Sequence, residues 1–304
     1  MDRFFTFTGN LLAETSCVYK DIRLGATQRA TSQSFQVGGK GVNAAKAAER
    51  MGLETCALIF AGGFAGARCL KWLEENALFE ILNVELPGET REGLVAVSES
   101  GVETTFLGKD VPLSENLFGQ ALDMLGGKIS SGDILAVCGS IPDFTARMAE
   151  LLQKFKAEQK IILFADTYSD ALTLIHPFAD LIKVNAAEFM QLSGKLKLGD
   201  TLESSFRNFT EKFPQKLLAV TDGPNAAWFY DGNKISRHIP PAVEKEVSAT
   251  GSGDVVTAGC AHFFTRNGGV SADDFQKCLN LASYCASTPG VAEFDAQKLS
   301  ALKF

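Results

Sequence analysis

Short apolar runs alternate with amphipathic helical stretches along most of the chain. The runs lie in MGLETCALIFAGG, DILAVCGS, KIILFADT, ADLIKVN and KLLAVTDG, and each ends in a small or polar residue. Helical stretches such as FTARMAELLQKFKAEQK separate them. Apolar runs without polar alternation are typical of parallel strands that are covered on both faces. The pattern predicts β-α-β units around a parallel sheet, with ligands beyond the carboxyl ends of its strands.

Two segments depart from this alternation. Residues 15–37 and about 86–108 show alternating half-buried positions and turn signals, with no helix between the strands. Strands inserted in this way predict a small β-lid that moves on and off a ligand. Surface hairpins without a role in closure are the alternative. Because no internal repeat, low-complexity tract or linker interrupts the chain, we expect a single domain over residues 1–304 with the lid strands inserted.

Composition and charge narrow the class of partner. The chain has 304 residues, 46% of them hydrophobic and 21% charged, which is enough to bury a large core. A net charge of -7 and a pI near 5.2 argue against a nucleic-acid or anionic-membrane surface. A local basic pocket for a phosphorylated small molecule stays compatible with this charge. We therefore expect a small-molecule partner.

From the N-terminal segment and the cysteines we expect a cytoplasmic protein. The opening MDRFFTFTGNLLAETS lacks a basic region and a long apolar stretch, so it predicts a first strand and not a signal peptide. No apolar run approaches the roughly 18 residues of a membrane helix. The seven cysteines are scattered without a CxxC pair, and the chain has only three histidines. We therefore expect reduced thiols and neither a zinc site nor a disulfide framework.

The stretch SATGSGDVVTAGCAHFF contains a candidate anion site. Gly251, Ser252 and Gly253 lead into a helical run, so their backbone N–H groups would point out of a helix N-terminus, where the helix dipole also favours an anion. The stretch matches neither the Walker A pattern nor the dinucleotide fingerprint. A carboxylate at Asp254 could accept a proton from a substrate hydroxyl beside that anion site. The alternative is that Asp254 is a helix-capping residue.

The stretch IKVNAAEFMQL contains a candidate metal site. Asn185 and Glu188 are three residues apart, so they share one face of the first turn if a helix begins there. This placement suits Mg²⁺ held mostly through water near phosphates. A capping box, with Asn at the N-cap and Glu three residues later, is the alternative and is favoured by the pattern itself.

A third motif, GGKGVNAAKAAERMG at residues 38–52, places three glycines directly before a helical run. Together with NAAE and GSGD, in that order, it resembles the PfkB or ribokinase-type family of carbohydrate kinases. The resemblance covers nearly the whole chain and extends to VCGSIPDF, FADT and VTDGPNAA. It implies a ribokinase-like three-layer α/β/α core with a mostly parallel sheet and a small β-lid. It also implies ATP and Mg²⁺ as cofactors and leaves a monovalent cation open.

The resemblance implies roles for individual residues. Asp254 would deprotonate the acceptor hydroxyl, and Glu188 with Asn185 would organise the Mg²⁺ hydration shell. Residues that would contact the sugar are Glu14, Arg29, Gly38, Gly39, Asn43, Arg91 and Ser140. Residues that would contact the nucleotide or the transferring phosphoryl group are Lys183, Asn185, Thr221, Gly223, Gly251, Ser252 and Gly253. Residues 282–288 would wall the adenine, and Lys40 receives no role. A packing role is the alternative for the glycines of the GGKG motif.

Within the family, the chain is most similar to the phosphosugar branch that includes 1-phosphofructokinase and tagatose-6-phosphate kinase. Ser248 opens the SATGSGD string, as in that branch, and Arg29 with Arg91 fall where the branch grips a phosphate. The chain departs from the branch at Glu14, where an aspartate is usual, and at Thr27, where a lysine is frequent. Ala226 also replaces a glycine expected in the nucleotide loop.

The resemblance predicts an ATP-dependent kinase of a sugar phosphate such as fructose 1-phosphate, fructose 6-phosphate or tagatose 6-phosphate. Solvated lid positions are the alternative for both arginines. A kinase of a free sugar or nucleoside is a second reading, and a non-catalytic sugar or nucleotide sensor on the same fold is a third. A nicotinamide-dependent dehydrogenase is disfavoured, because no strand is followed by GxGxxG. Lid strands of this family can pair between subunits, so a homodimer through the lid is open.

Overall fold

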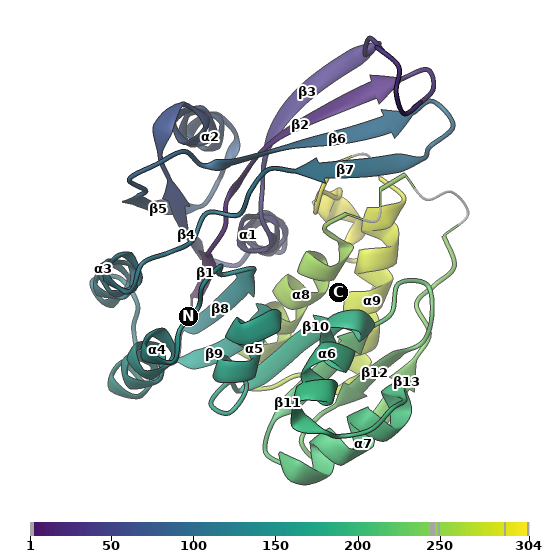
Figure 1. Cartoon of the computed structure of the whole chain (residues 1–304). Coiled ribbons are helices and arrows are strands. Elements are labelled where there is room, and N and C mark those ends of the chain that lie inside the picture. The colour runs from purple at the N-terminus through teal and green to yellow at the C-terminus, as the bar shows by residue number, and fades with distance from the viewer. Residues whose placement is uncertain (1–2, 244–246, 249, 289, 303) are drawn as a thin grey trace.

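The computed structural model describes residues 3–243, 247–248, 250–288, 290–302 and 304. Within them, a nine-stranded sheet has the strand order β13-β12-β11-β10-β9-β8-β1-β4-β5 (Figure 1). All its pairs are parallel except those that join β11, β12 and β13. The strands are β1 (Phe4–Thr8), β4 (Thr55–Ala61), β5 (Glu80–Glu85), β8 (Ile134–Gly139), β9 (Ile162–Thr167), β10 (Leu181–Asn185), β11 (Leu217–Thr221), β12 (Ala227–Tyr230) and β13 (Ile235–His238).

Helices cover both faces of this large sheet. Because alternate strand residues point to opposite faces, Phe4 packs into one apolar cluster while Phe5 and Phe7 pack into another. One face carries α1 (Lys40–Arg50), α2 (Gly63–Asn76), α8 (Ser252–Asn267) and α9 (Ala272–Ala286). The other carries α3 (Glu115–Gly126), α4 (Ala146–Gln159), α5 (Ser169–Ile175), α6 (Ala186–Leu196) and α7 (Leu202–Lys212). The predicted three-layer α/β/α core is confirmed.

A four-stranded small sheet has the order β3-β2-β6-β7 and stands over one end of the molecule (Figure 1). Its strands are β2 (Leu12–Tyr19), β3 (Ser32–Gly38), β6 (Arg91–Ser98) and β7 (Glu103–Leu107). It begins directly after the carboxyl end of β1, and β3 leads straight into α1. The outer strand β7 is exposed along its whole length, and pairing of two such sheets stays a prediction.

Two further findings bear on the sequence-based expectations. All seven cysteines are buried as free thiols. Within the described ranges, no helix combines the length and apolar character that a bilayer span requires. A short 3-10 helix, η1 (Ala296–Lys298), lies in the C-terminal segment.

Candidate active site

The carboxyl ends of the parallel strands and three helix N-termini bring charged side chains together. Asp166 near the end of β9 accepts hydrogen bonds from Lys183 on β10 and from Lys40, the first residue of α1. Glu188 in the first turn of α6 contacts the same lysine, and Asp254 lies in the first turn of α8. This is the edge at which ligands were expected.

Asp254, the predicted general base, is buried at the start of α8. It is the third residue of α8, whose N-cap is Gly251, and its carboxylate accepts a hydrogen bond of 2.8 Å from Asn43 Nδ2. Burial and the neighbouring Asp166 raise the pKa of Asp254 to about 6, although Lys183, Lys40 and Asn43 act in the opposite direction. Because Gly251 is the N-cap, the Asp254 side chain is not the helix cap. The pKa of Asp254 lies closer to neutral pH than that of an ordinary aspartate.

Asp166 is the centre of a buried ion network. Its oxygens accept hydrogen bonds from Lys40 Nζ at 3.1 Å, from Lys183 Nζ at 3.2 Å and from Thr257 Oγ1 at 2.5 Å. Burial disfavours its charge, but Lys183 and Lys40 outweigh burial and hold its pKa below the ordinary value. Sequence analysis assigned no role to Lys40, Asp166 or Thr257. The available signal was an aspartate inside an otherwise apolar strand.

The GSG turn is held tightly against its surroundings. Gly251 has a φ of 83°, and a Cβ atom there would lie 2.7 Å from the backbone nitrogen of Ala292. A Cβ atom on Gly253 would lie 2.8 Å from Lys183 Nζ, so the ammonium sits directly against the start of α8. The hydroxyl of Ser252 is buried without a partner among the described residues. These features fit an anion-binding helix N-terminus reinforced by a lysine.

The NAAE motif forms a capping box. Asn185 Oδ1 accepts from the Glu188 backbone N–H at 2.8 Å, and Glu188 Oε2 accepts from the Asn185 backbone N–H at 2.9 Å. The remaining Glu188 oxygen accepts from Lys40 Nζ at 2.7 Å. Within the described residues, no three His, Cys, Asp or Glu side chains are grouped to hold a metal. A metal role of this motif stays a prediction.

The glycines of the GGKG motif have a packing reason. Gly39 has a φ of 126°, and a Cβ atom there would lie 2.7 Å from Thr8 Cγ2. A Cβ atom on Gly41 would collide with Thr8 Oγ1, whereas one on Gly38 would lie 3.2 Å from Glu14 Oε2. The absence of a side chain at Gly39 and Gly41 thus lets α1 start against β1. Contact of Gly38 and Gly39 with a ligand stays a prediction.

Beside the network lies a second group of polar side chains at the foot of the small sheet, here called the polar rim. Asn10 Nδ2 donates to Asp110 Oδ1 at 2.8 Å and to Ser140 Oγ at 3.1 Å. Arg91 donates to the same Asp110 oxygen at 2.8 Å. Asn10 Oδ1 and Arg91 Nε are buried without a partner among the described residues. The polar rim consists of Asn10, Glu14, Lys46, Arg91, Asp110 and Ser140.

Glu14 and Lys46 are the buried charges of the rim. Glu14 on β2 accepts from Gln36 Nε2 at 2.5 Å, and burial raises its pKa. Lys46 on α1 lies over the ring of Trp72, with its ammonium 5.0 Å from the centroid. Burial lowers the pKa of Lys46, and its Nζ has no hydrogen-bond partner among the described residues. Sequence analysis did not single out Lys46.

The two arginines expected at a phosphate differ in position. Arg91 has a side chain only 10% exposed, whereas Arg29 lies exposed in the connection between β2 and β3. Within the described residues, Arg29 makes no side-chain hydrogen bond or ion pair, so the structure does not bring it to the site. The small sheet does reach the core, because Glu103 on β7 accepts a hydrogen bond of 3.2 Å from Thr250, directly before the GSG turn.

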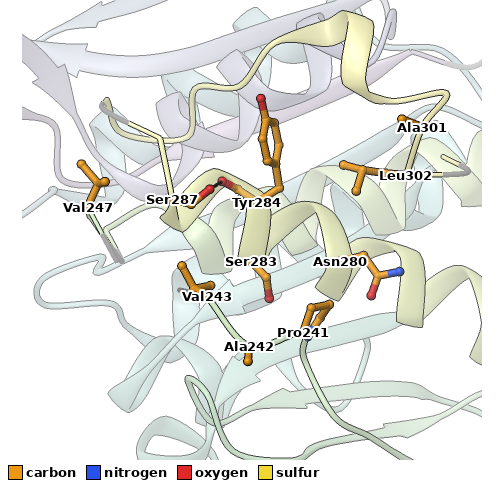
Figure 2. A pocket seen from close by; sticks show the side chains of 10 residues that line it. All are labelled: Pro241, Ala242, Val243, Val247, Asn280, Ser283, Tyr284, Ser287, Ala301 and Leu302. Atoms are coloured by element: carbon orange, nitrogen blue, oxygen red, sulfur yellow. Dashed lines mark hydrogen bonds between the residues drawn. The ribbon is translucent and has the colours of Figure 1, made fainter. Parts of the chain in front are cut away.

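A cavity of about 690 Å³ lies along the outer side of α9 (Figure 2). Ser283 and Tyr284 of this helix and its C-cap residue Ser287 line it, as do Ala301 and Leu302 near the C-terminus. Ser283, Tyr284 and Ser287 fall within the range 282–288 that was expected to wall an adenine. The segment after β13 completes the lining with Pro241, Ala242, Val243 and Val247, and Asn280 is the remaining member. Thr221 and Gly223 do not line this cavity.

Comparison with known proteins places the whole chain in one group. The model of the family described as pfkB family carbohydrate kinase matches residues 6–289. Among curated proteins, ATP-dependent 6-phosphofructokinase isozyme 2 of Escherichia coli is 28% identical over 260 residues, which cover 84% of this chain and 83% of that protein. The 1-phosphofructokinase of Borreliella burgdorferi is 26% identical over 306 residues, which cover 97% of this chain and 95% of that protein.

The fold is shared with solved structures. A crystal structure of phosphofructokinase-2 from Escherichia coli in complex with potassium superposes with a TM-score of 0.88, at 23% sequence identity and over 100% of both chains. A putative ribokinase from Agrobacterium tumefaciens gives a TM-score of 0.77 at 16% identity, and covers 100% of this chain and 98% of that one. Both neighbours have the architecture described here, with a large sheet between helical layers.

Proposed function

The chain belongs to the pfkB family of carbohydrate kinases and is a phosphotransferase acting on a sugar hydroxyl, and we propose that its acceptor is a sugar phosphate, with Mg·ATP as the donor. The candidate acceptors are fructose 1-phosphate, fructose 6-phosphate or tagatose 6-phosphate. The names of the two curated relatives support a phosphofructose acceptor.

The observation that carries the mechanism is the placement of Asp254 beside the GSG turn. In the proposed reaction, the Asp254 carboxylate accepts the proton of the acceptor hydroxyl while that oxygen forms a bond to the γ-phosphorus. The bond between the γ-phosphorus and the ADP oxygen breaks, and Asp254 later releases its proton to solvent. Lys183 and the N–H groups at the start of α8 stabilise the negative charge on the transferred group.

The residues present fit a magnesium ion that is held mainly by phosphate oxygens and water. Glu188 is the carboxylate that would orient the water ligands, since carboxylate oxygens and water are the ligands Mg²⁺ prefers. When bound, the ion would neutralise charge on the phosphate chain. The cavity along α9 is proposed to take the adenine, because Ser283, Tyr284 and Ser287 line it and it is large enough for a base.

An ADP-release assay with Mg·ATP tests the acceptor. Fructose 1-phosphate, fructose 6-phosphate and tagatose 6-phosphate are measured beside fructose, ribose and adenosine, and the Asp254→Asn variant serves as the blank for contaminating kinases. We expect turnover of at least one sugar phosphate at a rate well above every free sugar. Turnover of free sugars alone would contradict the proposed acceptor and leave the phosphotransferase assignment intact.

A further inference from the structure

Arg91 already holds an anion that belongs to the chain itself. One of its terminal nitrogens donates to Asp110 Oδ1 at 2.8 Å, and the other lies 3.4 Å from the backbone oxygen of Asn10. Asn10 Nδ2 donates to the same Asp110 oxygen at 2.8 Å. A carboxylate oxygen that accepts from a guanidinium and an amide uses the donors that a phosphate oxygen would use.

Asp110 and Arg91 differ in how firmly the fold holds them. Arg91 opens strand β6 and its side chain is 10% exposed, whereas the side chain of Asp110 is 56% exposed. Asp110 lies in residues 108–114, an irregular stretch that leaves β7 and enters α3. The carboxylate therefore approaches the arginine from the solvent side, and it can leave without opening the core.

Several polar groups around Arg91 are free to bind a ligand. Arg91 Nε and Asn10 Oδ1 are buried without a partner among the described residues, even with Asp110 in contact. Ser140 Oγ lies 3.1 Å from Asn10 Nδ2 at the carboxyl end of β8. A single carboxylate oxygen leaves these groups unused, whereas a tetrahedral anion with several acceptor oxygens and a ligand with hydroxyl groups can reach more of them.

We propose that Asp110 is an internal anion that occupies Arg91 and that the phosphate of the substrate must displace. The proposal rests on the proposed function, in which the acceptor carries a phosphate. A dianionic phosphate binds the guanidinium more strongly than one carboxylate, so it displaces Asp110, whereas a neutral sugar does not. Asp110 thereby weakens binding of sugar phosphates and makes occupation of Arg91 depend on the charge of the ligand.

The first experiment removes the charge of Asp110 and keeps its shape. In Asp110→Asn, we expect KM for the sugar phosphate to fall about fivefold, the size of one partly exposed charge contact, with kcat and KM for ATP unchanged. Asp123→Asn is the matched control, because Asp123 is exposed on α3 and makes no side-chain hydrogen bond or ion pair with a described residue. An unchanged or higher KM for the sugar phosphate in Asp110→Asn would overturn the proposal.

The second experiment identifies Arg91 as the group for which Asp110 competes. Inorganic phosphate is used as the probe, and its inhibition constant against the acceptor is measured in the wild type, in Asp110→Asn, in Arg91→Ala and in the double variant. We expect about fivefold tighter inhibition in Asp110→Asn and no such gain when Arg91 is also replaced. A gain of equal size without Arg91 would overturn the proposal.

The two proposals fail in different ways. If only free sugars are turned over by the wild type and by Asp110→Asn, the proposed acceptor is wrong. Phosphate inhibition of the free-sugar reaction then still decides the role of Asp110: tighter inhibition that depends on Arg91 supports it, and equal inhibition in wild type and variant overturns it.

Discussion

The two halves of the site differ in how completely their charged side chains are paired. In the ion network, both oxygens of Asp166 and both oxygens of Glu188 accept hydrogen bonds, and Asp254 is held by Asn43. In the polar rim, Asn10 Oδ1, Arg91 Nε and Lys46 Nζ are buried with no partner among the described residues. The charged side chains of the proposed phosphoryl-transfer half are therefore paired before a ligand arrives, although Ser252 Oγ and Asn43 Oδ1 beside them are buried without a partner among the described residues, whereas two charged side chains of the rim keep an unpaired nitrogen.

The difference has a physical meaning. A buried polar group without a partner costs about 1–3 kcal/mol, and that free energy is regained when a ligand supplies the partner. Catalytic charges lose their advantage if they must reorganise during the reaction, so they are held by the protein itself. We expect changes in the ion network to lower kcat and changes in the polar rim to alter KM for the acceptor.

Asp254→Asn tests the network half and has the largest expected effect. The variant keeps the shape of the side chain and loses the base, so kcat should fall by ~10² to 10⁴ with little change in either KM. Steady-state kinetics, with nucleotide binding as a check on the fold, measures the split. Asp273→Asn, in the first turn of α9, is the control. Turnover within tenfold of the wild type would show that Asp254 is not the base.

Glu188→Gln separates the capping role of the NAAE motif from its proposed metal role. Glutamine at this position still completes a capping box, so thermal stability should fall only by what the weakened contact with Lys40 costs. The Mg²⁺ concentration for half-maximal activity should rise about tenfold, as expected for a residue that orients metal-bound water. A magnesium titration of the variant and of Glu211→Gln, an exposed control on α7, measures it. An unchanged magnesium titration would contradict the metal role, and lowered stability would then report the lost ion pair with Lys40, because glutamine keeps the cap.

Lys46→Met tests the rim half. Methionine replaces the stem of the lysine and removes a buried ammonium, so stability should be unchanged or higher. If the ammonium donates to the bound acceptor, KM for the acceptor should rise about tenfold with kcat preserved. Acceptor titrations and thermal unfolding separate the two effects, with Lys234→Met in the β12–β13 turn as control. Loss of kcat at constant KM would break the contrast between the halves.

The pH dependence gives the finest test of the network. Asp254 must be ionised to accept a proton, and its pKa is raised to about 6, so kcat should be constant above this pH and fall below it. Asn43→Ala removes a donor that favours the ionised form, and the acid limb should therefore move to higher pH. Profiles of kcat for both proteins show the shift. An unmoved limb would place another group in control of it.

The fold was largely predictable, because buried parallel strands appear in the sequence as short apolar runs and amphipathic helices as a helical repeat of apolar positions. The GSGD motif likewise places its aspartate in a first turn by local rules alone. Asp166 and Lys40 escaped prediction, because they meet across 126 residues and only the strand order brings β9 beside α1. The contact of Asp110 with Arg91 could not be predicted either, because Asp110 lies in a loop whose sequence carries no distinctive pattern. The NAAE motif showed its cap plainly, since capping depends on residues three apart.

The buried thiols offer a practical use. Because every native cysteine is sequestered from solvent, a dye that reacts with thiols has no competing target on the surface of the folded protein. A single cysteine introduced in place of Leu24, which is 93% exposed at the end of the small sheet, would carry the dye in an otherwise unaltered background. The fluorescence of that label would report the position of the sheet in real time during a catalytic cycle.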